Sequence, residues 1–353
     1  MTAEPELDLL LAGTVFFDLV FTGIPHEPRR GTEVWTKGMG SAPGGIANLA
    51  VAAARLGLRT AVASGFGDDL YADWLWTTLR DQEHIDLSFS QRHPGHHTPV
   101  TVALSYDDDR AFVTHGHPWP TSTSEMLANP PRTRAVLVDL GDETMRAEGW
   151  WRRAAEQGAL VFATAGWDPE QRWDPRILDE LAGCHAFVPN AEEAMGYTRT
   201  GSVEAALEAL SARVPLAIVT QGRAGVSAID RSTGERANVP AVPVETVDTT
   251  GAGDVFAAAV VLGTLHGWSL RKRLAFASLC SALAVTQVGG SLAAPGWGDV
   301  ADWWSQQRAA NDGAGPAGDL VSRYAFLTEC LRGVETPRVR RAEATIARLS
   351  DAG

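Results

Sequence analysis

Short apolar runs alternate with helical patterns between residues 134 and 220, and this alternation limits the possible folds more than any other feature of the sequence. Strands separated by helices form βαβ units, in which the strands lie parallel and helices cover both faces of the sheet. The sequence therefore predicts an α/β fold with a mostly parallel central sheet. The expected strands are Ala135–Leu140, Ala159–Ala163, Ala186–Pro189 and Leu216–Thr220, and the expected helices are Met145–Gln157, Ile177–Leu181, Ala191–Tyr197 and Val203–Ala212.

The N-terminal part of the chain has a different pattern, with several short strands outside that alternation. Leu7–Val15 is an apolar run long enough for a buried strand, and Glu33–Lys37 suggests a short exposed strand. Val100–Ser105 and Arg110–Thr114 flank three consecutive aspartates, Asp107–Asp109, which is typical of a β-hairpin with an acidic turn. We expect the short strands of two-residue period, but not the buried run Leu7–Val15, to form a small sheet that projects over the core as a lid. Helices are expected at Ile46–Leu56 and Leu70–Leu79.

Composition and charge exclude several classes of protein. The chain has 353 residues and a formal net charge of −13, which argues against binding to nucleic acid or to an anionic membrane surface. The N-terminus is acidic and lacks a signal-peptide pattern, and no apolar stretch is long enough to cross a membrane. Three widely separated cysteines have no metal-ligand spacing. The sequence thus predicts a soluble, cytoplasmic protein.

The segment Asp248–Asp254 combines a glycine-rich turn, two hydroxyls and two carboxylates, and then enters the apolar helical run Phe256–Leu262. A turn that opens a helix leaves backbone N–H groups unpaired under the positive end of the helix dipole, and glycines let that backbone approach an anion closely. The carboxylate that ends the turn would oppose an anion, but it could take a proton from a hydroxyl that attacks a phosphate. The segment suits a phosphoryl-transfer site, although a plain helix cap would use the same residue types.

Two further segments near the N-terminus could hold a polar ligand. Gly44 and Gly45 precede the expected helix that carries Asn48, so the backbone can approach a ligand while the Asn amide bonds to hydroxyls. Asp18 lies just past the first expected strand, at the edge of the sheet where ligands bind in parallel α/β folds. A glycine loop before a helix remains the alternative for the first segment.

Two segments in the second half suit phosphate and metal chemistry. Asn190 and Glu193 share one face at the start of a helix and could hold the water shell of Mg²⁺, although the same spacing makes a capping box. Thr220 ends a strand that leads into a turn with Gly222 and Gly225, which could line the phosphates of a nucleotide or form an ordinary turn.

Taken in this order, the motifs resemble those of the ribokinase-type sugar kinases, the phosphofructokinase-B superfamily, over residues 7–295. The matching signatures are Gly-Gly-x-x-Asn at Gly44–Asn48, Asn-x-x-Glu at Asn190–Glu193 and the complete Asp-Thr-x-Gly-Ala-Gly-Asp at Asp248–Asp254. An Ala-rich helix, Leu274–Val285, and then Gly289, Gly290 and Pro295 complete the resemblance. It implies a three-layer αβα sandwich with a mostly parallel sheet, and a small β-sheet lid built from residues of about 13–45 and 98–115.

The resemblance implies an ATP- and Mg²⁺-dependent kinase acting on a hydroxyl of a small sugar. It also leaves open a homodimer through the lid strands and a K⁺ site at Asp248 and Thr250, with backbone near Gly289. The resemblance implies that Asp254 is the general base and that Gly251, Ala252 and Gly253 form the anion hole. It implies sugar binding for Asp18, Gly44, Gly45 and Asn48, and metal binding for Glu193. It implies nucleotide binding for Asn190, Thr220, Gly222, Gly225 and Thr250.

The substrate stays open at this stage. Fructokinase-like and ketodeoxygluconate-kinase-like members carry Asp-x-Asn-x-Arg where this chain has Ala163, Ala165 and Trp167, which argues against a plain member of either type. A sugar phosphate would need basic side chains in the pocket, and Arg110 in the expected lid is one candidate. A nucleoside kinase and, in a different class, a non-catalytic sugar- or nucleotide-binding regulator are the alternatives.

The last part of the chain, residues 296–353, lies outside the resemblance. A linker-like stretch, Asn311–Gly318, precedes two segments with helical patterns, Leu320–Leu331 and Arg338–Leu349. We expect a C-terminal helical extension, and its role is open between a cap on the core, a dimer interface and a mobile tail.

Overall fold

An eight-stranded sheet forms the centre of the protein in the computed structural model, which describes residues 5–106, 110–166, 171–310 and 315–342. Its strands are β1 (Leu7–Ala12), β4 (Thr60–Ala63), β9 (Thr133–Asp139), β10 (Leu160–Thr164), β11 (Ala186–Phe187), β12 (Leu216–Thr220), β13 (Val226–Asp230) and β14 (Glu235–Val239). They are ordered β14-β13-β12-β11-β10-β9-β1-β4. All pairs from β4 to β12 are parallel, whereas β13 and β14 are antiparallel additions. The predicted mostly parallel sheet is confirmed.

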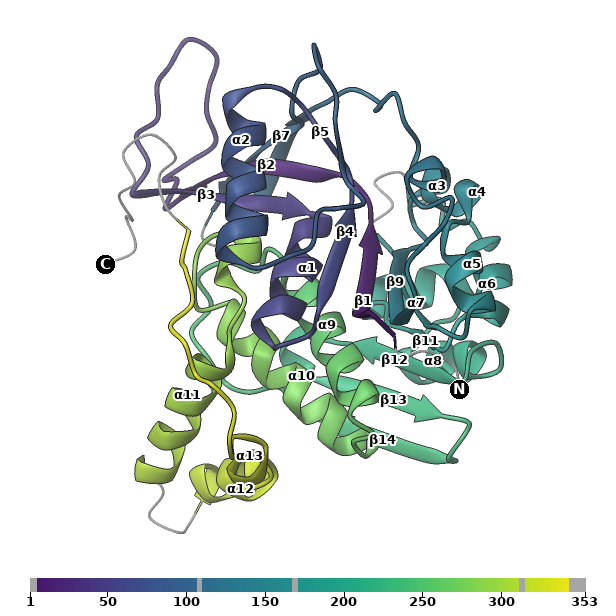
Figure 1. Ribbon diagram of the computed structural model, residues 1–353. Helices are drawn as coiled ribbons and strands as arrows, with labels where there is room; N and C mark the ends of the chain where they lie inside the picture. Colours follow the sequence, from purple (N-terminus) through teal and green to yellow (C-terminus); the bar gives the residue numbers. More distant parts are fainter. Residues whose placement is uncertain (1–4, 107–109, 167–170, 311–314, 343–353) are drawn as a thin grey trace.

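Helices cover both faces of this sheet, so the fold has three layers (Figure 1). Alternate residues of β1 enter two separate hydrophobic clusters, because successive side chains of a strand point to opposite faces. Leu9 and Leu11 belong to one cluster, and Leu10 and Ala12 belong to the other. The first cluster includes residues of α1 (Ile46–Arg55), α9 (Ala252–Leu265) and α10 (Leu270–Ala284), and the second includes residues of α5 (Trp151–Glu156), α6 (Ile177–Glu180), α7 (Ala191–Thr198) and α8 (Val203–Ser211).

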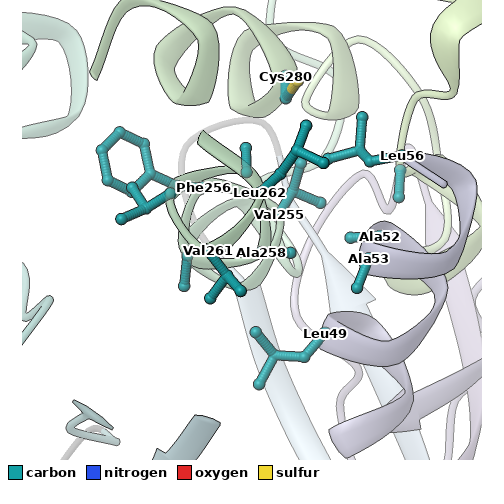
Figure 2. Packing of buried hydrophobic residues seen from close by; sticks show 14 of the residues in the cluster. Leu49, Ala52, Ala53, Leu56, Val255, Phe256, Ala258, Val261, Leu262 and Cys280 are labelled. Carbon is teal, nitrogen blue, oxygen red and sulfur yellow. The ribbon is translucent and has the colours of Figure 1, made fainter. Parts of the chain in front are cut away.

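Helices α1 and α9 pack tightly, and this contact fixes the geometry of the site. Figure 2 shows Leu49 and Ala52 of α1 facing the side of α9 that carries Val255 and Ala258. Small alanine side chains on both helices let the two backbones approach closely, and the flanking Leu and Val side chains fill the remaining space. Cys280 of α10 is fully buried at the same contact. The N-terminal ends of α1 and α9 are thereby held side by side.

A second sheet has the order β3-β2-β7-β8 and lies beyond the N-terminal end of α1 (Figure 1). Its strands are β2 (Val15–Thr22), β3 (Gly38–Gly45), β7 (Val100–Ser105) and β8 (Arg110–His115). The expected hairpin strands are confirmed, whereas its turn, Asp107–Asp109, lies outside the described residues. The strand expected at Glu33–Lys37 is wrong, because these residues form no strand and pairing with β2 begins at Gly38. The glycine-rich stretch interpreted as a loop before α1 is itself strand β3.

Several other expectations about elements also need correction. The helix expected at Met145–Gln157 is divided into α4 (Glu143–Glu148) and α5, because Gly149 between them has a φ of +60°, outside the helical region. Residues 338–342, expected to be helical, are in neither helix nor strand, and the remainder of that expected helix is outside the described residues. The other helices of this part of the fold are α2 (Leu70–Thr77), which continues as a short π-helix over Thr78–Gln82, and α3 (Thr123–Met126).

The C-terminal part comprises three helices and an extended segment. The helices are α11 (Trp297–Ala310), α12 (Gly315–Tyr324) and α13 (Leu327–Cys330), so α12 begins within the stretch interpreted as a linker. Tyr324 is fully buried and donates a hydrogen bond of 3.1 Å to the carbonyl oxygen of Ala275 in α10. This contact anchors α12 to the helical layer beside the central sheet. Across the described residues, the structure has no helix with the length and apolar character of a membrane span.

Candidate active site

The N-terminus of α9 is the centre of the candidate site. Gly251 is its N-cap and has a φ of +74°, in the left-handed region that glycine adopts without strain. The preceding turn is fixed by the Asp248 carboxylate, which accepts hydrogen bonds from the backbone N–H groups of Thr250 (2.9 Å) and Gly289 (3.2 Å). The N–H of Ala252 donates a 3.3 Å hydrogen bond to the carbonyl oxygen of Thr249, whereas the N–H of Gly253, also in the first turn, has no preceding carbonyl in helical position. A glycine turn that opens a helix suits an anion, which is the role that the sequence predicted for these residues.

Asp254 lies in the first turn of α9 and is held by α1. The side-chain amide of Asn48 donates a 3.1 Å hydrogen bond to Oδ2 of Asp254. Burial raises the pKa of Asp254 to about 7; the Asn48 hydrogen bond opposes this rise, and the negative charge of Asp139 adds to it. A carboxylate with a pKa near neutrality is suited to accept a proton at physiological pH.

Asp18 and Gly44 make a second polar surface on adjacent strands. Asp18 lies inside β2 of the second sheet, and not at the end of the first strand of the central sheet as the sequence suggested. A Cβ atom on Gly44 would overlap the Asp18 carboxylate, so only glycine leaves room for it. Burial raises the pKa of Asp18 to about 7, with a contribution from the charge of Asp248. Gly45, the N-cap of α1, has a φ of +62°, which carries the chain from β3 directly into the helix with Asn48.

A third carboxylate, Asp139, belongs to this site, and the sequence reasoning missed it. It ends β9, and its Oδ1 accepts hydrogen bonds from the backbone N–H groups of Gly141 (2.8 Å) and Gly166 (2.9 Å). Burial raises its pKa, and its charge in turn raises the pKa values of Glu193 and Asp254. The signal that could have found it is an acidic residue at the carboxyl end of a parallel strand, the edge where ligands bind.

Asn190 and Glu193 form the capping box that the spacing allowed. The Asn190 side chain accepts from the N–H of Glu193, and the Glu193 carboxylate accepts from the N–H of Asn190, both at 2.9 Å. Burial raises the pKa of Glu193 to about 7, with contributions from Asp139, Glu192 and Asp254. Among the described residues, no group of three acidic, His or Cys side chains could hold a metal ion unaided. The mutual repulsion of these carboxylates nevertheless fits a cation that keeps most of its water ligands, as Mg²⁺ does.

A cavity of about 540 Å³ opens on the other side of the α9 N-terminus. Its polar end contains Thr220, Gly222 and Gly225, all three predicted to line a nucleotide, together with Thr249 and Gly253. Its walls are largely apolar, and none of this apolar lining was predicted: Ala241, Val242, Pro243, Val244, Phe256 and Val285. The volume is in the range of small-molecule sites, and an apolar slot beside a helix N-terminus suits a base attached to phosphates.

Two residues predicted to bind the nucleotide lie beside this cavity without lining it. Asn190 pairs with Thr220 in an isolated parallel bridge, so it is adjacent to the polar end. Thr250 lies on the opposite side of the turn, near Gly290, and its hydroxyl is buried with no hydrogen-bond partner among the described residues. The oxygen Oδ1 of Asn48 is also buried and lacks a partner in the described structure. Both are polar atoms that a bound ligand or ion could satisfy.

The second sheet contributes a basic side chain to the turn. Cross-strand pairing puts Asp18, Phe112 and Arg110 on one face of the sheet, since residues directly opposite in a register share a face. The Arg110 guanidinium donates a hydrogen bond to the hydroxyl of Thr249, within the Asp248–Asp254 motif. It also lies over the Phe112 ring, 5.4 Å from its centre. The sheet thus contacts the turn before α9 directly.

Comparison with known proteins agrees with this arrangement. A fructokinase from Klebsiella pneumoniae is 32% identical over 277 residues, a match that covers 72% of this chain and 89% of the fructokinase. Among solved structures, a putative ribokinase from Agrobacterium tumefaciens matches with a TM-score of 0.72 at 23% identity, covering 86% of this chain and 99% of its own. The ribokinase of Arabidopsis thaliana, in complex with ribose and ATP, matches with a TM-score of 0.69 at 21% identity, covering 84% and 98%.

The structural matches establish the ribokinase fold, with the three layers described above. The match of a family model is more specific, because it spans both the Asp18 surface and the α9 turn. Residues 18–296 match the model of the pfkB family of carbohydrate kinases. Together with the fructokinase match, this extent shows that the chain belongs to the pfkB carbohydrate kinase family.

Proposed function

We propose that the protein transfers the γ-phosphate of ATP to a primary hydroxyl of a small, uncharged sugar. The observation that carries the proposal is the position of Asp254, which lies at the α9 N-terminus beside the cavity and is hydrogen-bonded to Asn48. The Arabidopsis ribokinase, whose structure contains ribose and ATP, supports ATP as the nucleotide in the cavity.

In this mechanism the Asp254 carboxylate accepts the proton of the acceptor hydroxyl, whose oxygen attacks the γ-phosphorus. The bond between that phosphorus and the bridging oxygen breaks, and ADP leaves. The N–H groups of Gly251 and Gly253, at the positive end of the α9 dipole, stabilise the negative charge of the transferring phosphoryl group. Ala252 belongs to the same anion hole, and its N–H would have to give up its 3.3 Å bond to the Thr249 carbonyl oxygen to contribute. Asp18, with the backbone at Gly44 and Gly45, binds sugar hydroxyls.

When bound, Mg²⁺ would neutralise negative charge on the phosphate oxygens in such a reaction. Glu193 and Asn190 are the residues that would hold its water shell, because the metal prefers few protein ligands and several waters. A monovalent cation such as K⁺ fits the other side of the turn, where the Thr250 hydroxyl is buried without a partner among the described residues and the Asp248 side chain is buried as well. Comparing turnover in KCl, NaCl and choline chloride tests this second ion.

The charge of the acceptor side favours a neutral sugar over a sugar phosphate. Asp18 and Asp254 bring two carboxylates to this side, and the charge of Asp139 reaches Asp254; all three have a raised pKa. A phosphorylated acceptor would add further negative charge to a region where acids already repel one another. Arg110, the candidate for phosphate recognition in the lid, donates to Thr249 at the opposite, nucleotide side of the turn.

The decisive test is Asp254→Asn, which keeps the shape of the side chain and removes the base. Turnover with ATP, Mg²⁺ and the acceptor should fall by about 10²–10⁴-fold, the usual contribution of a general base. ATP binding, measured by calorimetry, should be nearly unchanged. Asp302→Asn on the exposed face of α11 is the matched control. Normal turnover in Asp254→Asn would overturn the mechanism.

The acceptor itself requires a screen. Phosphate transfer should be measured over neutral pentoses and hexoses, their phosphates and nucleosides. We expect the highest kcat/KM with a neutral sugar. A preference for a sugar phosphate or for a nucleoside would identify the alternative kinase classes. Ligand binding without any phosphate transfer would instead indicate a regulator built on the kinase fold.

A further inference from the structure

The last described segment, residues 332–342, returns from the C-terminal helices to the second sheet. Figure 1 shows it as an extended yellow stretch that leaves α13, passes α11 and ends beside β3. It lies wholly beyond residue 296, where the match to the family model ends. It is therefore a feature of this chain that the family comparison does not explain.

Specific contacts hold the segment along this path. Arg55, at the end of α1, donates to the carbonyl oxygens of Arg340, Leu292 (3.0 Å) and Ala294 (2.6 Å). Its guanidinium is also paired with Glu83 at 2.8 Å, and both side chains are almost completely buried. A buried Arg with all its donors engaged is a rigid connector, because breaking any one bond leaves a charged group unsatisfied. The extended segment is thus tied to α1 and to the turn at residues 290–294.

Arg340 connects the segment to the back of the second sheet. Its side chain donates a 3.0 Å hydrogen bond to the Thr78 hydroxyl and lies over the Trp74 ring, 5.4 Å from the centre. Trp74 in turn packs edge-on against Phe17, with ring centres 5.4 Å apart. Phe17 immediately precedes Asp18 in β2, so this chain of contacts ends next to the acceptor surface.

Ala342 lies at the seam between the second sheet and the turn after α10. It is 6% exposed and clusters with Ala42 of β3 and Leu292. A Cβ atom on Gly40 would lie 3.3 Å from the Ala342 methyl group, and one on Gly289 would overlap that group. The Ala342 methyl group therefore fills the space beside two glycines. Gly40 lies in β3, the strand paired with the strand of Asp18, and Gly289 lies in the turn whose N–H binds Asp248.

Two neighbours of Ala342, namely Ala42 and Gly289, connect it to the acceptor side. Ala42 is the cross-strand partner of Asp18 in the β2–β3 register. Gly289 donates its N–H to the Asp248 carboxylate, which also fixes the turn before α9. A small shift of the segment would move β3 relative to Gly289, and hence the Asp18 surface relative to the α9 turn.

We propose that Arg340–Ala342 is a positioning strap, which holds β3 and Gly289 so that the Asp18 surface and the α9 turn meet at the acceptor. The inference rests on the proposed kinase activity only for its kinetic readout. Since the strap residues do not line the 540 Å³ cavity, its effect should fall on the acceptor and on turnover, with ATP binding unaffected.

The test uses the full-length chain with two strap variants and one control. Ala342→Leu adds volume at the seam, and Arg340→Ala removes the contact with Trp74. Arg338→Ala changes an exposed arginine of the same segment and is the matched control. Kinetics are measured with ATP, Mg²⁺ and whichever of D-fructose and D-ribose the wild-type protein phosphorylates faster. Hydrogen–deuterium exchange of peptides covering residues 38–45 and 286–292 is measured without any substrate.

Both strap variants should lower kcat/KM for the sugar by about 10–100-fold, the effect of misplacing reacting groups by an ångström or less. The KM for ATP and the melting temperature should stay close to those of wild type, and exchange should be faster in both peptides. Arg338→Ala should behave as wild type in every measurement.

Unchanged kcat/KM for the sugar in both strap variants would overturn the strap. A parallel change in sugar KM, ATP KM and melting temperature would also overturn it, because it would indicate a purely structural role. If wild type phosphorylates neither of these two sugars, exchange alone decides: faster exchange in both strap variants supports the strap, and unchanged exchange overturns it.

Discussion

The side-chain amide of Asn48 donates a 3.1 Å hydrogen bond to Oδ2 of Asp254, across 206 positions of sequence. The bond joins the first turns of α1 and α9, whose close packing depends on small side chains along both helices (Figure 2). It also lowers the pKa of a carboxylate that burial would otherwise raise further. Helix packing thereby controls both the position of the proposed base and its protonation.

Replacing Asn48 with Leu should shift the pH dependence of turnover. The Asn48 amide stabilises the ionised form of Asp254, whose pKa is raised to about 7 mainly by burial, so removing the amide should raise that pKa further. Asp254 acts as a base only when it is deprotonated. In a plot of kcat against pH, the midpoint of the rise on the acidic side should therefore move to higher pH by roughly half a unit to one unit. A kcat profile from pH 5 to 9 measures this. Asn238→Leu, on the exposed strand β14, should leave the midpoint in place, and a shift to lower pH in Asn48→Leu would contradict the argument.

Gly44→Ala should weaken acceptor binding selectively. A methyl group on Gly44 would overlap the Asp18 carboxylate, and the cross-strand position leaves no room for it to turn away. We expect sugar KM to rise about tenfold or more, equivalent to about 1.4 kcal/mol, with little change in ATP KM. Steady-state kinetics with each substrate varied in turn provide the measurement. Gly183→Ala is the control, because nothing lies within 4 Å of the added Cβ; equal effects of the two variants would remove the special role of Gly44.

The sequence predicted the α9 turn well because its signal is local. Gly251 needs a left-handed conformation and Asp254 follows within the same turn, so consecutive residues carry the whole pattern. The alternation of strands and helices likewise predicted the parallel sheet, since both periods are visible in short windows.

Strand β3 and Asp139 escaped prediction for a different reason. The stretch Gly38–Gly45 has the composition of a loop, and its strand conformation follows from pairing with β2, where glycine leaves space for Asp18. Asp139 resembles any acidic residue after a strand until Gly166, Glu193 and Asp254 are brought around it by the fold. Tertiary contacts decide both features; for Asp139 the local pattern marks only an acidic residue at a strand end, and the fold supplies the neighbours that make it part of the site.

Stability should fall as the pH rises from about 5 to about 8. Asp18, Glu193 and Asp254 each have a folded-state pKa raised to about 7, above the value of an unfolded carboxyl group. Between these two pKa values the folded state binds more protons than the unfolded state, so the free energy of unfolding falls as the pH rises. The stabilisation is fully present below the unfolded pKa and is lost as the pH rises through the folded pKa. Melting temperatures measured in buffers of equal ionic strength should drop by several degrees over this range.

Asp254→Asn should reduce that slope and leave the protein more stable than wild type at pH 8, because the amide stays neutral where the buried carboxylate must ionise. Asp302→Asn, an exposed position, should follow the wild-type curve. A wild-type melting temperature that rises steadily from pH 5 to pH 8 would contradict the raised pKa values.

Arg55→Met should destabilise the whole protein, because it breaks a buried network and not a surface ion pair. The Arg55 and Glu83 side chains are 4% and 5% exposed, and Arg55 also satisfies carbonyl oxygens of the residue 290–294 turn. Removing one partner leaves Glu83 buried and unpaired, which costs about 3–5 kcal/mol in the free energy of unfolding. Denaturant unfolding measures the loss. Arg80→Met offers a matched comparison, since the Arg80–Asp81 pair is 56% and 46% exposed and solvent screens its attraction, so the loss should be far smaller; a similar loss in both variants would mean that burial of the Arg55 network has no special weight.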